Sequence, residues 1–198
     1  RGVADIYPLT PTQTGMVVHG LDEAEHGLYT EQITFVLDGA RDLGLVAAAW
    51  QHAVDHTPVL RTAVALHGVP VPLQVVHQRV KLPITEHDWS TLSDDERAVE
   101  LERLLAAQRS PALALDQAPL LRLALVRLGP DAVRVVWTFH HVLLDGWSVF
   151  HVLSDVLAAH AALARGEQPS PPERRPFADY AAWLAALDTG GAQEHWRD

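Results

Sequence analysis

A strand that runs directly into two adjacent histidines and then into a helix is the feature that most constrains how this chain folds. Residues 132–139 are rich in β-branched and aromatic side chains, a composition typical of a strand. Apolar residues recur at helical spacing over residues 148–157, and Asp145 or Ser148 is placed to satisfy the free N–H groups of the first turn. The two histidines are therefore expected at a strand-to-helix junction, where an acid/base site can be built.

His140 and His141 are this pair. Adjacent residues of a strand point to opposite faces, so the two imidazoles cannot both reach one metal or substrate while the strand stays regular. Parity places His141 on the face of Trp137 and Phe139, and His140 on the face of Thr138. A histidine pair at a strand end is by itself more often structural than catalytic, so we expect one of the two to be structural.

The rest of the chain alternates between helical and strand patterns. Helices are predicted over residues 12–21, 43–56 and 93–108, the last opened by a Ser-x-x-Glu capping box. Strands are predicted over residues 29–37, 60–66, 73–77 and 82–85, and residues 121–128 and 132–139 form a hairpin around Gly129-Pro130-Asp131. A Pro-rich surface loop is predicted over residues 166–172. The order predicts an α+β fold with a mixed sheet flanked by helices.

Composition excludes several classes of function. With 198 residues and 48% hydrophobic content, the chain can bury a core as one domain. Fifteen basic against 25 acidic residues give a formal net charge of −10, which argues against a nucleic-acid partner. The sequence shows no apolar run near the roughly 20 residues of a membrane span and no signal-like N-terminus, so we expect a cytoplasmic protein without a membrane partner. Zero cysteines exclude disulfides and a thiolate nucleophile, and the remaining histidines lack ligand spacing, so no metal is assigned.

Four segments, in order, carry a resemblance to a known family. The segment His140-His141-x-x-x-Asp145-Gly146-Trp147-Ser148 resembles the core motif of nonribosomal peptide synthetase condensation domains. In chain order, the first motif is Tyr7-Pro8-Leu9-Thr10-Pro11-x-Gln13-x-Gly15-Met16-x-x-His19 and the second is His56-x-Pro58-Val59-Leu60-Arg61-Thr62. The core motif is the third, and the fourth is Pro176-Phe177-Ala178-Asp179-Tyr180-Ala181-Ala182-Trp183-Leu184. The chain departs from the family pattern at Thr57-Pro58, where Glu often follows the His, and at Thr12 and Thr14.

The resemblance implies an architecture and an activity. Residues 1–198 resemble the N-terminal lobe of a two-lobed domain related to chloramphenicol acetyltransferase, with the C-terminal lobe absent from this chain. The implied activity is that of an amide-forming acyltransferase, which joins a donor aminoacyl or peptidyl thioester to the amine of an acceptor. Both substrates would be carried on the 4'-phosphopantetheine of peptidyl carrier proteins, and the domain itself would bind no cofactor. The other implied partners are an adenylation domain and the C-terminal lobe of the same synthetase, without which the lobe is expected to be inactive.

The resemblance also assigns roles around the two histidines. It places His141, His140, Asp145 and Gly146 in the catalytic motif, with His141 as a base or as a positioner of the amine, whereas His140 is expected to be structural. Asp145 is expected either to cap the following helix or to form an ion pair with Arg61 beneath the histidine loop. Gly146 is expected to allow a close approach or simply to make a turn, with its N–H near the oxyanion.

The remaining candidates are supporting residues. Trp137, Trp147 and Trp183 are predicted to be core aromatics, with Trp147 alternatively facing the channel, and Ser148 is expected to support the loop. Three first-motif residues are expected to line the acceptor side of the tunnel: Gln13, Gly15 and Met16.

Alternative functions remain open at this point. The first and third motifs resemble those of the subtype that joins a D-configured donor to an L-acceptor, although dual epimerising and condensing domains share parts of the pattern. A non-catalytic condensation-like domain that recruits a carrier protein or partner enzyme is the main alternative, but such domains tend to lose the second His or the Gly. A lipid acyltransferase also fits His140-x-x-x-x-Asp145, and the acidic composition and the other motifs argue against it.

Overall fold

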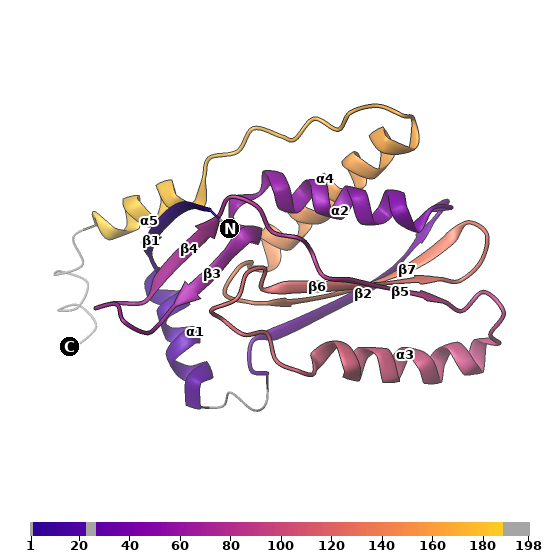
Figure 1. Ribbon diagram of the computed structural model, residues 1–198, viewed down its shortest axis with the longest axis horizontal. Helices are drawn as coiled ribbons and strands as arrows, with labels where there is room; N and C mark the ends of the chain where they lie inside the picture. Colours follow the sequence, from indigo (N-terminus) through magenta and orange to yellow (C-terminus); the bar gives the residue numbers. More distant parts are fainter. Residues whose placement is uncertain (1, 23–26, 188–198) are drawn as a thin grey trace, which may run out of the picture.

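The chain forms two β-sheets with helices packed around them (Figure 1). The computed structural model describes residues 2–22 and 27–187. One sheet is antiparallel, with strand order β1-β4-β3, and comprises β1 (Val3–Pro8), β4 (Leu73–His77) and β3 (Thr62–Ala65). The other has strand order β2-β7-β6-β5 and comprises β2 (Thr30–Asp38), β7 (Ala132–His140), β6 (Leu121–Arg127) and β5 (Ile84–Asp88). In it β5 runs parallel to β6 and the other pairs are antiparallel, so the predicted α+β fold with a mixed sheet is confirmed.

The helices cover the four-stranded sheet on both faces (Figure 1). They are α1 (Pro11–Asp22), α2 (Leu43–His56), α3 (Asp94–Arg109), α4 (Gly146–Ala164) and α5 (Phe177–Ala185), and a short 3₁₀ turn (Pro58–Arg61) precedes β3. Helices α2 and α4 lie together on one face and α3 lies on the other, while α1 and α5 lie beside the three-stranded sheet. A long connector, drawn in orange, runs from α4 to α5.

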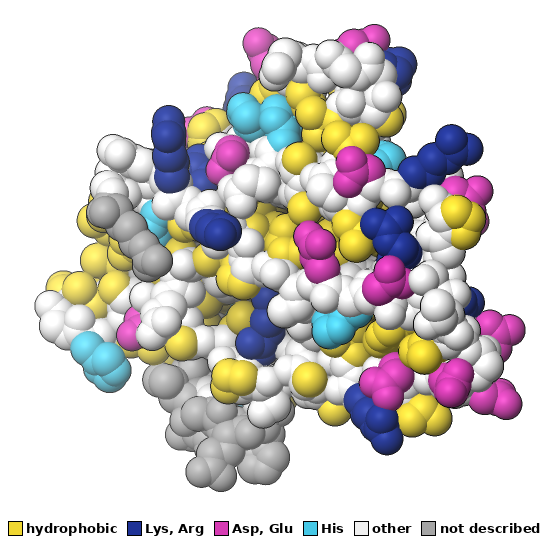
Figure 2. All heavy atoms as spheres, turned by 45° about the vertical axis from the view of Figure 1, so that its right-hand side comes forward, with side chains coloured by type: hydrophobic (Ala, Val, Ile, Leu, Met, Phe, Trp, Pro, Cys, Tyr) yellow, Lys and Arg dark blue, Asp and Glu magenta, His cyan; other side chains and the backbone are white. Residues whose placement is uncertain are grey.

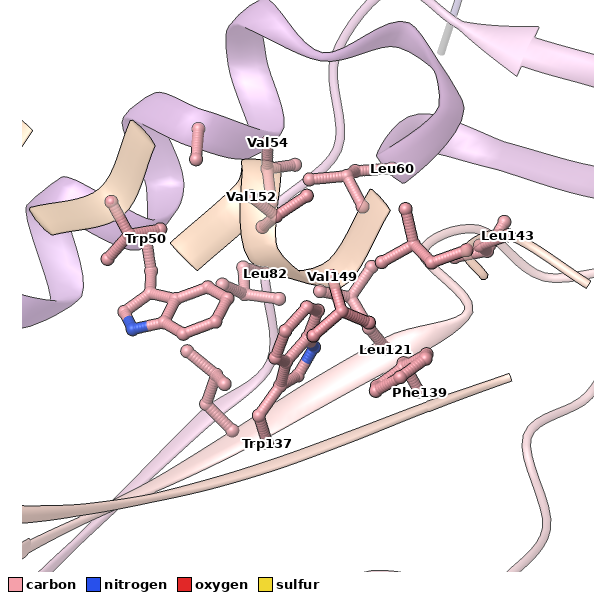
Figure 3. Close-up of a cluster of buried hydrophobic side chains, with 14 of the residues drawn as sticks. Trp50, Val54, Leu60, Leu82, Leu121, Trp137, Phe139, Leu143, Val149 and Val152 are labelled. Carbon is pink, nitrogen blue, oxygen red and sulfur yellow. The ribbon is translucent and has the colours of Figure 1, made fainter. Parts of the chain in front are cut away.

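The main core fills the space between the four-stranded sheet and the α2–α4 pair (Figure 3). Trp137 and Phe139 point into it from alternate positions of β7, and Trp50 of α2 meets Trp137 edge-to-face with ring centroids 4.9 Å apart. On the opposite face, Val136 belongs to a second cluster that includes Leu104 of α3. Because β7 is buried on both faces, the histidines at its end start from a rigid strand.

Several elements differ from the sequence predictions. The edge strand β1 was not predicted, because its residues are mostly exposed and show no alternation of apolar and polar side chains. The strand predicted over residues 82–85 begins two residues later, since its bounds follow its parallel pairing with β6, a contact distant in sequence. The start of the segment predicted over residues 60–66 is a 3₁₀ turn introduced by Pro58.

Helix α4 is more apolar than the sequence analysis anticipated. By length and composition it is the one helix in the described part of the chain that meets the criteria of a membrane span. Core helices pass the same test when they are mostly buried, whereas 22% of this stretch of α4 is buried; one side of α4 packs in the main core through Val149 and Val152. On the surface drawn in Figure 2, acidic and basic side chains are interspersed, with apolar atoms exposed between them.

Candidate active site

His140 is the last residue of β7 and is buried, with 6% of its surface exposed. Its backbone N–H donates to the carbonyl of Leu120 over 3.0 Å, and its Nδ1 lies 3.1 Å from the backbone N–H of Val142. An N–H can only donate, so Nδ1 accepts and the neutral ring carries its proton on Nε2. Burial, and secondarily the neighbouring imidazole of His141, lowers the pKa of His140 to about 4. His140 is therefore a neutral, structural imidazole.

His141 is the first residue after β7, and its half-buried side chain lines a cleft. Its backbone N–H still donates to the carbonyl of Tyr29 over 2.7 Å, which continues the pairing beside β2. Its Nδ1 lies 2.7 Å from the carbonyl oxygen of Leu144. A carbonyl only accepts, so Nδ1 carries a hydrogen, and in the neutral ring Nε2 keeps a free lone pair. The two adjacent histidines thus hold opposite tautomers, and His141 is the one equipped to act as a base.

The cleft has a volume of about 1460 Å³ and is bordered by α1, α2, α4, the connector and α5. His141, Asp145 and Ser148 line it, together with Gln13 and Met16 of α1. The other candidates of the same motifs are not among its lining residues: His140, Gly146, Trp147 and Gly15. The structure therefore brings the first and third motifs to one cavity, although they lie more than a hundred residues apart.

Asp145 caps helix α4. Its Oδ1 accepts a hydrogen bond of 2.7 Å from the backbone N–H of Ser148, which satisfies one of the free donors at the helix start. Hydrogen bonding from the Ser148 side chain first, and from its backbone N–H second, lowers the pKa of Asp145. A Cβ added to Gly146 would meet no atom within 4 Å, so packing inside the described chain does not require glycine there.

The expected ion pair between Arg61 and Asp145 is wrong. Arg61 is buried, and its guanidinium donates to three backbone carbonyls, those of Val54 (3.1 Å), His77 and Gln78 (2.9 Å). The ion pairs that join the described residues do not include Arg61 with Asp145. Instead Arg61 links the end of α2 to the end of β4, and burial lowers its pKa, opposed by the nearby charge of Asp55. Each side chain is bonded to backbone groups of its own surroundings, and the two are not bonded to each other.

Because Arg61 and Asp145 are not bonded to each other, substitutions of the two residues should have additive effects on stability. Replacement of Asp145 by Ala should lower the free energy of unfolding by about 1 kcal/mol, as expected for a lost helix cap. Replacement of Arg61 by Met should act independently, so the double variant should equal the sum of the single ones within about 0.5 kcal/mol. Urea unfolding of the four proteins measures these free energies. A coupling energy above about 1 kcal/mol would show that Arg61 and Asp145 interact after all.

Of the three tryptophans predicted to be core aromatics, one is buried and two are exposed. Trp137 is fully buried, as predicted, whereas Trp147 is 81% exposed and Trp183 is 57% exposed, so the core assignment of these two is wrong. Trp147 lies in the first turn of α4, off the buried stripe that begins at Val149. Trp183 lines the cleft, and its ring lies 5.8 Å from that of Tyr180.

A group of charged and imidazole side chains along the cleft was not predicted from the sequence. His52 and His56 of α2 lie one turn apart with ring centroids 4.0 Å apart, and their i,i+4 spacing was a readable signal. Desolvation first, and His56 second, lowers the pKa of His52, while Asp55 and Asp155 oppose the change. Arg174 of the connector forms a bidentate ion pair with Asp155 of α4, which ties the connector to the helix. Among the described residues, no group of three His, Cys, Asp or Glu side chains has the geometry of a metal site.

Comparison with known proteins gives a consistent result. Residues 3–198 match the family model described as Condensation domain. One of the subunits of linear gramicidin synthase from Brevibacillus parabrevis is 39% identical over 198 residues, which are 100% of this chain and 2% of that protein. Tyrocidine synthase 2, from the same organism, is 31% identical over 196 residues, 99% of this chain and 6% of that protein. The chain thus spans a small part of these curated relatives.

Solved structures show the same fold. The starter condensation domain of rhizomide synthetase superimposes with a TM-score of 0.82 at 19% identity, and the match covers 96% of this chain and 48% of that chain. The first condensation domain of the calcium-dependent antibiotic synthetase, in complex with a substrate analogue, gives a TM-score of 0.80 at 20% identity, covering 93% of this chain and 45% of that one. The chain accordingly corresponds to just under half of each of these chains.

Proposed function

The chain belongs to the condensation domain family, and on that premise we propose that it is the N-terminal lobe of a domain that forms peptide bonds in nonribosomal peptide synthesis. The substrates proposed are a carrier-bound aminoacyl or peptidyl thioester as donor and the amine of a carrier-bound acceptor. The peptide-antibiotic synthases among its relatives support this substrate class, since their names describe assembly of peptides such as linear gramicidin.

One observation carries the proposal. His141 lines the cleft with Nδ1 held by the carbonyl of Leu144, so the lone pair of Nε2 is free to accept a proton. An imidazole whose Nε2 faces the reacting groups can position an amine and accept its proton, which is a role suited to amide formation from a thioester and an amine. The neighbouring His140 is buried and bonded to Val142, so it does not compete for this role.

The proposed step forms a carbon–nitrogen bond, breaks a carbon–sulfur bond and moves one proton from nitrogen to sulfur. The acceptor nitrogen attacks the thioester carbonyl carbon, the carbon–nitrogen bond forms, and the carbon–sulfur bond then breaks. Nε2 of His141 accepts the proton that the nitrogen loses, and the same proton is then available to the departing thiolate. The N–H of Gly146, at the start of α4 beside the cleft-lining Asp145, is proposed to face the developing oxyanion, although Gly146 itself does not line the cleft of this chain.

The timing of proton transfer follows from ordinary basicities. An α-amine is a stronger base than a free imidazole, so removal of its proton before attack is uphill by about 2 kcal/mol. After attack the nitrogen is far more acidic and gives up its proton readily. We therefore assign His141 the roles of positioning the amine and accepting the proton late.

The wider context of the domain is part of the same proposal. We propose that a second lobe closes the cleft and that carrier proteins deliver both substrates on 4'-phosphopantetheine, within a cytoplasmic synthetase that also holds an adenylation domain. The match to about half of each solved condensation-domain chain supports the two-lobe arrangement. The cleft already present in this chain provides one wall of the proposed tunnel.

The test is a transfer experiment with the longer protein that carries this chain. It is mixed with a loaded donor carrier and a loaded acceptor carrier, and the intact mass of the acceptor carrier is followed with time. We expect a mass gain equal to the donor acyl group, with loss of that group from the donor. An acceptor mass that stays unchanged while both carriers remain loaded and bound would favour the non-catalytic recruiting domain.

A finer proposal concerns the donor's stereochemistry. The Leu9-Thr10-Pro11-x-Gln13-x-Gly15-Met16 and Leu143-Leu144-Asp145-Gly146-Trp147-Ser148 segments resemble those of domains that join a D-configured donor to an L-acceptor. Inversion of one α-carbon exchanges a side chain and a hydrogen, so a tunnel shaped for one isomer misplaces the thioester of the other. A displacement of about 1 Å in the reacting geometry can lower the rate about 10²-fold.

This predicts faster condensation of the D-epimer, by up to about 10²-fold. Donor carriers are loaded with peptides that differ only at the terminal α-carbon, and initial rates are compared with one acceptor. The control is the pair of hydrolysis rates without acceptor, which should be equal. A faster L-epimer would overturn the subtype and leave the condensation proposal in place.

A further inference from the structure

Gln13 makes hydrogen bonds that tie the first motif to the histidine loop. Thr10 and Gln13 form a capping box at the start of α1: the Gln13 N–H donates to the Thr10 hydroxyl over 3.4 Å, and Gln13 Oε1 accepts from the Thr10 N–H over 3.0 Å. Because the Thr10 N–H only donates, the amide atom that faces it is the oxygen. The orientation of the Gln13 amide is therefore fixed, and its NH₂ group points the other way.

That NH₂ group reaches the loop directly after His141. Gln13 Nε2 donates to the carbonyl of Val142 over 2.9 Å and to Gln74 Oε1 over 3.1 Å. Gln74 returns the contact, donating from its own Nε2 to Gln13 Oε1 over 3.0 Å and to the carbonyl of Pro8 over 3.3 Å. Gln13 is 7% exposed and Gln74 is 1% exposed, so both N–H bonds of each amide are used inside the protein.

The other hydrogen bonds that hold the histidine loop, residues 141–144, come from backbone groups and from the side chains of His140 and His141. The Val142 N–H donates to His140, the His141 N–H donates to Tyr29, and His141 Nδ1 bonds the carbonyl of Leu144. In the described part of the chain, Gln13 is the one side chain outside residues 140–148 that hydrogen-bonds residues 141–144. The carbonyl that Gln13 binds, that of Val142, lies in the backbone between His141 and Leu144. The Leu144 carbonyl is the one that sets the tautomer of His141.

We infer that Gln13 is a positioning residue for His141: by holding the Val142 carbonyl it keeps the Leu144 carbonyl in reach of Nδ1 and so keeps Nε2 free. This inference rests on the proposed function for its effect on rate, whereas its effect on the imidazole tautomer does not. It also gives the Gln of the first motif a role other than lining a tunnel, because its polar atoms are occupied within the protein.

The test replaces Gln13 by Glu, which has the same shape and can still accept from Thr10 but cannot donate to Val142 when ionised. The matched control is Gln32→Glu. Gln32 likewise donates to a backbone carbonyl, that of Leu105, and to Thr138 of β7, but it lies away from the loop. Long-range ¹H–¹⁵N spectra of the imidazoles report the tautomer of each variant, and the His141→Ala spectrum assigns the His141 signals.

We expect the Nδ1–H form of His141 in the wild type and in Gln32→Glu, and a mixture of tautomers in Gln13→Glu. In the longer protein, Gln13→Glu should lower kcat by about 10- to 10²-fold with little change in the acceptor KM. In a His141→Ala background it should cause no further loss, because the effect acts through that imidazole.

An unchanged tautomer in folded Gln13→Glu overturns the inference, as does a loss of kcat that persists in the His141→Ala background. If Gln13→Glu does not fold, Gln13→Asn carries the same test, since it keeps the amide and only shortens the reach to Val142. If His141→Ala alone retains the full rate, the catalytic role proposed for His141 fails, and the tautomer result still decides the role of Gln13.

Discussion

Replacement of His141 by Ala is expected to lower the rate of condensation by about 10²–10⁴-fold, the usual contribution of a positioned acid/base. The side chain is half-buried at the wall of the cleft, and its removal leaves the backbone hydrogen bond from His141 to Tyr29 in place. We therefore expect the variant to fold. Single-turnover transfer between loaded carriers, followed by intact mass, measures the rate in the longer protein that carries the chain.

The matched control for this experiment is His67→Ala. His67 lies between β3 and β4 and is not among the residues that line the cleft, so its loss should leave the rate within about twofold. Circular dichroism before and after heating establishes that each variant is folded. Equal rates for the wild type and a folded His141→Ala protein would refute the assignment of the base.

Local sequence signals predicted most of the elements, and long-range pairing explains the failures. Helix α2 was predicted at its observed bounds because apolar residues recur along it and a Pro follows its end. The capping box at Ser93 and Glu96 was likewise visible and is present. The strand β1 has no such local signal, since its place is set by pairing with β4, about seventy residues later.

In the site, too, local patterns gave correct predictions and contacts distant in the chain did not. The alternation of side chains along a strand was enough to separate His140 from His141, because β7 remains regular up to its last residue. The partner of Asp145 was predicted correctly only in the local alternative, the helix cap, whereas the ion pair with Arg61 is wrong. The contact between Gln13 and Val142 spans 129 residues and left no local trace in the chain. Chain-distant hydrogen bonds of this kind become visible only once the fold is known.

Burial of His140 makes the stability of the protein fall as the pH falls below neutral. The pKa of His140 is lowered to about 4 from an ordinary value of 6.5, so the unfolded chain binds a proton at this residue before the folded chain does. Between these two values the unfolded state gains protons and stability is lost. The contribution is fully present above about pH 6.5 and is lost progressively as the pH falls toward 4, for a total of about 3 kcal/mol.

The measurement is the free energy of unfolding in urea at pH 7.5 and at pH 5, in the wild type and in His140→Asn. The Asn side chain places an oxygen where Nδ1 accepts from the Val142 N–H, so it keeps that hydrogen bond and removes the titration. We expect the wild type to lose about 2 kcal/mol more than His140→Asn over this range. Other groups with lowered pKa, such as His52 and Asp145, are common to both proteins and cancel in the comparison. Parallel pH dependences in the two proteins would mean that His140 is not held neutral, and the structural role assigned to it beside His141 would have to be abandoned.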